Sequence, residues 1–353
     1  MGNTISVIVM TTSHCNLQCK YCYATTSQDK TSKFEVDNIK TMIHNSSLHF
    51  DNVDFCWLGG EPLMAGLDFF ENVVEIQEQE KKYRNVKFQN SIQSSGVLLD
   101  DKWLTFFQEN EFHLGLSFDA PFDVGEIHRE VKKEQMISIC EMIHRYQLPL
   151  RTLCVTSKLN VNRGEEIFNL FKSLGVNSYS LLPLKSVPLS YRPLLPNEEE
   201  LYLLYKTTFD LWMETENNFS SIEPLDTMLR SILGSPPALC SFSAPCIKKM
   251  VTITQSGKVV PCGSLALDQF VFGDILQKSL LEILNDKAAK KLRNYRDEHI
   301  SSTCKGCEYL SICRGGCRSE AFWHTGDFKG DIPFCETHKK MFGYMIDRLH
   351  HLN

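Results

Sequence analysis

Three cysteines lie within eight residues near the start of the chain, in the segment SHCNLQCKYCYA (residues 13–24). Cys15, Cys19 and Cys22 have the spacing C-x3-C-x2-C, one thiolate short of the four that a four-iron cluster takes from a protein. A catalytic zinc site also keeps three protein ligands and leaves one position open. We therefore expect a metal centre whose open position is chelated by a small molecule bearing an amine and a carboxylate. A zinc knuckle and a chance cluster are the alternatives, because a short motif needs structural context.

Composition and charge restrict the class of protein. The chain has 353 residues, of which 42% are hydrophobic, and a formal net charge of -6. This charge predicts no nucleic-acid partner, and no apolar run approaches the roughly 20 residues of a membrane span. The segment ISVIVM is too short for the core of a signal peptide and has no basic residue before it. We expect a cytoplasmic protein without membrane contact, where clustered cysteines indicate metal sites rather than disulfides.

The 14 cysteines are not spread evenly. All but three fall in the N-terminal motif or after residue 239. Cys56, Cys140 and Cys154 stand apart, and we interpret them as small buried side chains.

The first half of the chain alternates β-type segments with amphipathic ones. Strands are predicted at residues 4–10, 52–58, 86–92, 112–118, 150–156 and 178–184. Apolar periodicity predicts helices within 67–80, 99–107 and 164–175. The alternation predicts an α/β fold with a curved or barrel-like parallel sheet, whose chemistry lies at the C-terminal ends of the strands. The three-cysteine motif follows the first strand directly.

The second half has a different character. Residues 186–196 contain three prolines and no periodicity, and helices are predicted at 197–216, where Asn197 is the cap, and at 225–234. A cysteine-rich segment follows. We expect a partial barrel core over 1–190, bridging helices over 191–239 and a small loop-rich domain with a C-terminal helix over 240–353.

The N-terminal motif, with Tyr21 just before its last cysteine, resembles the signature of the radical SAM superfamily. The resemblance implies a partial (β/α)6 TIM-like barrel and a [4Fe-4S] cluster whose fourth iron binds S-adenosylmethionine (SAM). In that family, reductive cleavage of SAM gives a 5′-deoxyadenosyl radical that takes a hydrogen atom from the substrate.

Further segments match the family in the same order. GGEP (59–62) follows the second predicted strand, LGLSFDAP (114–121) ends the fourth, and EIHR (126–129) comes soon after. Taken singly, these are also a glycine turn, a strand-end hydroxyl and a surface arginine. The positions that the resemblance assigns to SAM binding are Tyr21, Gly59, Gly60, Glu61, Pro62, Ser117 and Arg129.

The C-terminal cysteines resemble the seven-cysteine SPASM motif, and Cys240 adds an eighth thiolate. Eight thiolates are enough for two four-iron clusters. A pair of zinc sites is the alternative, since C-x2-C also binds zinc. The resemblance assigns one auxiliary [4Fe-4S] cluster to Cys240, Cys246, Cys262 and Cys317, and the other to Cys304, Cys307, Cys313 and Cys335.

Nearly the whole chain resembles the anaerobic sulfatase-maturating enzymes, which oxidise a cysteine or serine of a sulfatase to formylglycine. Four departures stand out. Gly263 replaces an aspartate that is the proposed base, Leu58 replaces a glutamine, Ala24 replaces an aromatic residue, and QSSG (93–96) replaces QTNG. Oxidation to a carbonyl needs a proton acceptor near the reacting group. We therefore expect a related maturase that takes hydrogen from a ribosomally made peptide and forms an oxidised or cross-linked residue, such as a cyclophane or thioether.

The alternatives are a formylglycine-forming sulfatase maturase, a radical dehydrogenase or epimerase of a small molecule such as an aminoglycoside, and a non-enzymatic electron carrier or zinc scaffold. The expected partners are a peptide or protein substrate and a flavodoxin- or ferredoxin-type reductant. A separate peptide-recognition protein is also expected, because the motif begins at residue 15 with no recognition domain before it. The base is not assignable from sequence. Its weak candidates, each with a solvated or structural role as the alternative, are Asp119, Glu126, His128 and Asp226.

Overall fold

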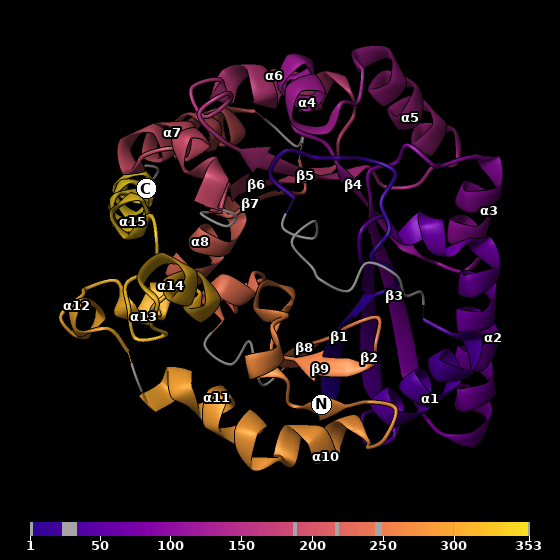
Figure 1. The fold of residues 1–353 in the computed structure, drawn as a ribbon. Helices are drawn as coiled ribbons and strands as arrows, with labels where there is room; N and C mark the ends of the chain where they lie inside the picture. Colours follow the sequence, from indigo (N-terminus) through magenta and orange to yellow (C-terminus); the bar gives the residue numbers. More distant parts are fainter. Residues whose placement is uncertain are drawn as a thin grey trace.

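The computed structural model describes residues 3–22, 34–185, 189–215, 219–243, 249–298 and 300–351. One curved sheet of ten strands runs through this part of the chain, in the order β10-β9-β8-β1-β2-β3-β4-β5-β6-β7 (Figure 1). Neighbouring strands from β1 to β7 are parallel, and β8 is also parallel to β1. The strands are β1 (Thr4–Met10), β2 (Asn52–Leu58), β3 (Lys87–Ser94), β4 (His113–Ser117), β5 (Arg151–Thr156), β6 (Ser178–Pro183), β7 (Ser221–Glu223), β8 (Met250–Ile253), β9 (Lys258–Val260) and β10 (Gly273–Asp274).

The predicted α/β fold with a parallel, barrel-like sheet is confirmed. The six predicted strands coincide with β1 to β6, and the largest shift is at β3, which spans 87–94 instead of 86–92. Burial alternates along β1 and β2, as half-buried strands require. The prediction missed β7, which has three residues and lies in the segment expected to hold bridging helices.

The division of the chain into three parts stays a prediction, and two strand pairings bear on it. β7 extends the barrel sheet beyond β6 into the middle segment. β8, with β9 and β10 antiparallel beside it, adds the C-terminal segment to the other edge of the same sheet. The cysteine-rich segment is therefore built onto the barrel through β1, the strand that leads into the three-cysteine motif.

Helices cover the outer side of the curved sheet and continue around it to close most of a ring (Figure 1). Asp100 caps α3 by accepting a hydrogen bond from the Trp103 N–H, and Asn197 forms a capping box with Glu200 at the start of α7. The helices are α1 (Val36–Ser47), α2 (Leu67–Tyr83), α3 (Asp101–Glu109), α4 (Phe122–Arg129), α5 (Lys133–Arg145), α6 (Gly164–Ser173), α7 (Glu198–Glu214), α8 (Leu225–Ile232), α10 (Leu280–Asn285), α11 (Lys287–Glu298), α12 (Ser302–Lys305), α13 (Leu310–Cys313), α14 (Arg318–Thr325) and α15 (Cys335–His350).

The core lies between the sheet and these helices. Trp57 on β2 packs edge-on against Phe69 and Phe70 of α2, and Phe70 in turn contacts Trp103 of α3. These side chains are buried, so they remove a large apolar area from water. The helices thereby fix the sheet from outside and leave its strand ends for the site.

The C-terminal helix α15 packs against α7 and completes the ring. The Thr337 hydroxyl donates to the Glu198 carbonyl at 2.8 Å, and the Thr337 N–H donates to the Glu198 carboxylate at 2.8 Å. This contact holds the cysteine-rich segment against the barrel. Over the part of the chain that the structure describes, no helix combines the length and apolarity needed to cross a membrane.

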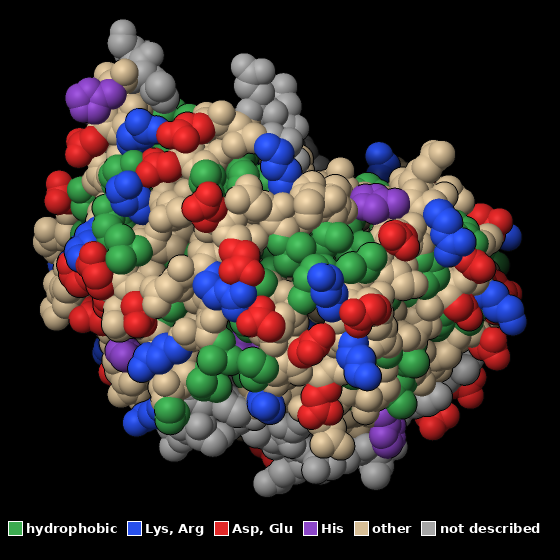
Figure 2. All heavy atoms as spheres, turned by 90° about the horizontal axis from the view of Figure 1, so that it is seen from above, with side chains coloured by type: hydrophobic (Ala, Val, Ile, Leu, Met, Phe, Trp, Pro, Cys, Tyr) green, Lys and Arg blue, Asp and Glu red, His purple; other side chains and the backbone are tan. Residues whose placement is uncertain are grey.

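The surface carries charges of both signs. On the face seen in Figure 2, Lys and Arg side chains alternate with Asp and Glu, with small hydrophobic areas between them. This face therefore offers no continuous basic surface of the kind that binds a nucleic-acid backbone.

Candidate active site

The three-cysteine loop leaves the end of β1 and is fixed on one side by the turn after β2. The Gly60 N–H donates to the Thr12 carbonyl and the Glu61 N–H donates to the His14 carbonyl, both at 2.8 Å. A Cβ at Gly59 would lie 2.4 Å from the Thr12 oxygen, and one at Gly60 would lie 2.2 Å from the His14 oxygen. Only glycine therefore allows the two segments to approach this closely. The contact places the loop at the C-terminal edge of the sheet.

Replacing Gly60 with alanine is expected to weaken SAM binding roughly ten- to hundredfold. The new methyl group would push the His14 carbonyl away and displace the neighbouring Cys15, at an overpacking cost of about 1–3 kcal/mol. Equilibrium dialysis with SAM on the anaerobically reconstituted protein measures the change. Gly306→Ala is the matched control, since a Cβ at Gly306 meets nothing within 4 Å. An unchanged dissociation constant in Gly60→Ala would contradict the role given to this contact.

Glu61 of the same turn has a side chain that is 2% exposed and fully engaged within the chain. Its Oε1 accepts from the Ser94 hydroxyl at 2.7 Å, and its Oε2 accepts from the Ser95 N–H at 2.9 Å and the Ser95 hydroxyl at 2.8 Å. The carboxylate thus ties the turn after β2 to the end of β3. Any contact of Glu61 with SAM would come from its backbone, and Pro62 begins the short 3-10 helix that follows.

Asp119, just beyond β4, is fully buried and fixes the other side of the loop. The Tyr21 hydroxyl donates to its Oδ2 at 2.6 Å, Arg129 Nε donates to Oδ2 at 2.9 Å, and the Val155 N–H donates to Oδ1 at 2.8 Å. Burial alone would raise the pKa of Asp119, but Arg129 and the hydrogen bonds outweigh it and lower the pKa below its ordinary value. The carboxylate is therefore ionised and acts as the acceptor that holds these groups together.

Arg129 connects this buried carboxylate to the cysteine loop. Its Nη1 lies 3.9 Å from the Cys19 sulfur, and its guanidinium carbon lies 5.3 Å from the centre of the Tyr21 ring. Burial lowers the pKa of Arg129, but Asp119 more than compensates and raises it above its ordinary value. The loop is also held by the Lys20 N–H, which donates to the His128 carbonyl at 2.9 Å. Tyr21 and Arg129, predicted from sequence, thus meet beside Cys19.

Ser117 ends β4 on the same edge of the sheet. Its hydroxyl accepts a hydrogen bond from Gln93 Nε2 of β3 at 2.9 Å, and both side chains are partly buried. The hydroxyl is therefore oriented by the chain itself. Its assignment to SAM binding stays a prediction.

The structure gives the four candidate bases other roles. His128 is buried, with Nδ1 3.2 Å from Asp119 Oδ2 and Nε2 3.2 Å from the Ser157 hydroxyl. Like Asp119, it belongs to the support beneath the cysteine loop. The sequence listed both as polar residues near the motif, and could not show that they are saturated by one another.

Glu126 and Asp226 are also engaged. Glu126 is exposed and accepts from the Lys133 N–H at 3.1 Å, which joins α4 to α5. Asp226 is largely buried on α8 and accepts from Arg230 Nε at 2.8 Å. We therefore no longer assign either residue as the base.

The N-terminal thiols are near neighbours. Burial raises the pKa of Cys19 to about 11, against the opposing charge of Arg129, and the nearby thiols Cys22 and Cys15 raise it further toward that value. Protonated thiols of this kind must release protons when a metal binds. Ala24, the position that departs from the aromatic residue, lies outside the described residues.

The C-terminal thiols form two groups in space, as the resemblance implies. Burial, and then the charge of Cys317, raise the pKa of Cys262 to about 11. Burial, opposed by Lys339, and then Cys313 and Cys304 raise the pKa of Cys335 to about 11. Cys304 in turn lies close to Cys307. Cys240 begins a 3-10 helix and is exposed, whereas Cys246 lies outside the described residues.

These groups fit iron–sulfur clusters better than single metal ions. Within the ranges described above, no three His, Cys, Asp or Glu side chains converge as ligands of one ion. A four-iron cluster takes one thiolate for each iron, so its ligands need only surround it. The isolated cysteines behave differently: Cys140 and Cys154 are buried in the core, as predicted, and Cys56 is partly buried on β2.

Comparison with protein families bears on the same two regions. Residues 9–171 match the model described as the radical SAM superfamily, and residues 240–308 match the SPASM model, described as an iron–sulfur cluster-binding domain. The first match includes the three-cysteine loop, its glycine turn and Arg129. The chain is a radical SAM enzyme with a SPASM domain. Its cofactors are SAM, the [4Fe-4S] cluster of the superfamily and auxiliary iron–sulfur clusters.

The enzyme has relatives over its whole length. The cysteine-type anaerobic sulfatase-maturating enzyme of Clostridium perfringens (strain 13 / Type A) is 28% identical, and the match covers 96% of this chain and 95% of the relative. The serine-type enzyme of Bacteroides thetaiotaomicron is 23% identical, covering 94% of this chain and 86% of the relative. These matches support the sulfatase-maturase alternative better than the expected cross-linking maturase.

Two solved structures share the fold and contain peptides. Native anSMEcpe with bound AdoMet and Cp18Cys peptide superposes with a TM-score of 0.88 at 24% identity, covering 99% of both chains. Streptococcus suis SuiB bound to precursor peptide SuiA superposes with a TM-score of 0.69 at 16% identity, covering 95% of this chain and 76% of SuiB. The same architecture therefore accommodates peptide substrates of two kinds.

Proposed function

We propose that this enzyme oxidises a cysteine or serine side chain of a peptide or protein substrate to an aldehyde, as a sulfatase maturase does. The observation that carries the proposal is the match to the cysteine-type maturase over 96% of this chain and 95% of the relative. The fold shared with a peptide-bound maturase supports it. The radical chemistry needs a hydrogen-atom acceptor, which SAM and its cluster supply when bound.

The chain's own residues prepare the site for this chemistry. The turn Gly59–Glu61 fixes the start of the cysteine loop, and Asp119 orients Arg129 and Tyr21 at its far end. Arg129 is a buried cation beside Cys19, so it is placed to receive an anionic group such as a carboxylate. We propose that the C-terminal cysteines hold two auxiliary [4Fe-4S] clusters, in the two groups that the resemblance assigns.

The test uses peptides of the Cp18Cys type, with cysteine or with serine at the reacting position, incubated anaerobically with reconstituted enzyme, SAM and dithionite. We expect an aldehyde that is trapped by a hydrazine reagent, formed together with 5′-deoxyadenosine. Formation of 5′-deoxyadenosine without aldehyde from either peptide would overturn the proposal. A physiological reductant of the flavodoxin or ferredoxin class, and a separate peptide-recognition protein, remain predictions.

The second candidate is the cross-linking peptide maturase expected from sequence. Gly263 favours it, because this residue replaces the aspartate proposed as the base in sulfatase maturases. Mass spectrometry of precursor-type peptides, searched for loss of hydrogen without aldehyde, separates the two candidates.

A further inference from the structure

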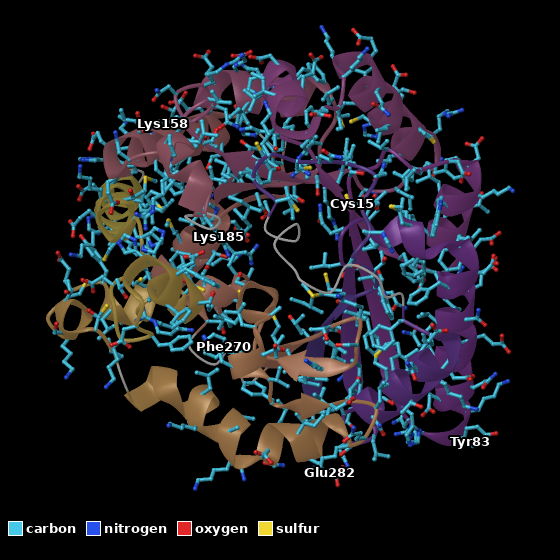
Figure 3. The ribbon with its side chains drawn as sticks, in the orientation of Figure 1. Cys15, Tyr83, Lys158, Lys185, Phe270 and Glu282 are labelled. Atoms are coloured by element: carbon cyan, nitrogen blue, oxygen red, sulfur yellow. The ribbon has the colours of Figure 1, made fainter. Side chains whose placement is uncertain are left out.

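Lys185 and Glu320 meet where the barrel faces the SPASM domain. Lys185 lies just after β6, at the C-terminal edge of the sheet, and Glu320 lies in the first turn of α14, three residues after Cys317. Lys185 Nζ is 3.8 Å from Glu320 Oε1, and 49% and 32% of the two side chains are exposed. In Figure 3, Lys185 and Cys15 lie on the inner side of the ring, on different arcs of it. The pair therefore faces the same interior as the SAM-binding loop.

The turn that follows Cys262 completes this group. Lys185 Nζ donates to the Ser264 hydroxyl at 3.0 Å, and Trp323 Nε1 donates to the Ser264 carbonyl at 2.8 Å. The charge of Lys185 also lowers the pKa of Cys262, which shows that the two lie close together. Gly263 lies in the same turn and contributes no side chain. The pair thus lies beside the thiols Cys262 and Cys317.

Glu320 differs from the other carboxylates near the strand ends. Glu61 and Asp119 are buried and saturated by hydrogen bonds, so neither is accessible to a substrate. Glu320 is partly exposed and contacts a lysine that favours its ionised form. Such a partly exposed pair adds little to folding stability, about 0–1 kcal/mol. The geometry leaves it available for proton transfer.

We propose that Glu320 is the catalytic base that accepts the substrate's proton, and that Lys185 holds its carboxylate in place. The inference rests on the proposed function. For a side chain –CH2–XH, where X is sulfur or oxygen, conversion to –CH=X removes one hydrogen atom, one electron and one proton. The hydrogen atom goes from carbon to the SAM-derived radical. The electron goes to an acceptor of the iron–sulfur class, and the proton goes from X to Glu320 as the C–X double bond forms.

The Glu320→Gln variant tests this assignment with the cysteine peptide of the Cp18Cys type. We expect aldehyde formation to fall by about 10²-fold or more, the range of a general base. Formation of 5′-deoxyadenosine and the dissociation constant of the peptide, measured by fluorescence anisotropy, should stay within about twofold of the wild type. Lys185→Met keeps the carboxylate and should lose less product.

Glu199→Gln is the matched control, because Glu199 also pairs with a lysine, Lys340, but joins α7 to α15. It should leave every readout unchanged. Wild-type aldehyde formation by Glu320→Gln would overturn the inference, and so would equal loss of aldehyde, 5′-deoxyadenosine and peptide binding, which indicates a structural role. Absence of aldehyde with the wild-type enzyme would instead overturn the proposed function, and the inference with it.

Discussion

An enzyme with Cys15, Cys19 and Cys22 all changed to alanine is expected to form no 5′-deoxyadenosine. These three thiols are near neighbours at the strand ends, and their loop is held by hydrogen bonds from both sides. Removing them removes every protein ligand of the SAM-binding cluster but leaves the C-terminal thiols intact. About eight irons per chain should therefore remain of about twelve in the wild type, by the arithmetic of four-thiolate clusters. Iron and sulfide assays, with chromatography of the SAM products, measure both quantities.

The control for this experiment is Cys56→Ala, which removes a partly buried thiol of β2 that belongs to none of the three groups. It should keep the full iron content and SAM cleavage. Continued SAM cleavage by the triple variant would refute the assignment of the N-terminal motif. A loss of all iron would instead show that the auxiliary sites depend on the first one.

The sheet was predictable where local pattern decides structure. The strands β1 to β6 have burial that alternates or nearly alternates along the strand, so sequence periodicity located each of them within two residues. β7 has only three residues, and β8 pairs with β1 although about 240 residues separate them in the chain. Neither short length nor distant pairing leaves a local pattern to read.

The site shows the same division. The cysteines and glycines were found because their type and spacing carry the chemistry. The role of Asp119 was missed, since its partner Tyr21 is 98 residues away and nothing local indicates full burial. Ser94 and Ser95 were seen only as a departure from QTNG, whereas they bind the Glu61 carboxylate. These contacts follow from the βα topology, which brings the ends of β2, β3 and β4 together.

Changing Asp119 to asparagine is expected to damage both stability and SAM cleavage. The side chain is fully buried and accepts hydrogen bonds from Tyr21, Arg129 and the Val155 N–H. Asparagine is nearly the same size but is neutral, so the buried Arg129 loses its counter-charge. Breaking a buried pair in this way costs about 3–5 kcal/mol. Anaerobic denaturant unfolding measures this difference in the free energy of unfolding.

The same substitution should lower the rate of 5′-deoxyadenosine formation by about 10²-fold. Arg129 and Tyr21 lie against Cys19 only because Asp119 holds them, and a displacement of about 1 Å at a reacting centre has an effect of this size. Asp123→Asn is the matched control, because Asp123 starts the same helix and pairs with Arg163 at the surface. Its effect on stability should be about 0–1 kcal/mol. An Asp119→Asn enzyme that matched this control in both measurements would contradict the role of the buried carboxylate.

The pH dependence of stability gives an independent check on Asp119. Its pKa in the folded enzyme lies below the ordinary value, so the unfolded chain binds the proton more tightly than the folded one. The stabilisation is therefore fully present above the ordinary pKa, and is lost as the pH falls through the lower folded value. The difference in unfolding free energy between wild type and Asp119→Asn should stay constant between about pH 5 and 8, and should shrink only below about pH 4. A difference that disappeared near neutral pH would mean that another group, such as His128, carries the interaction.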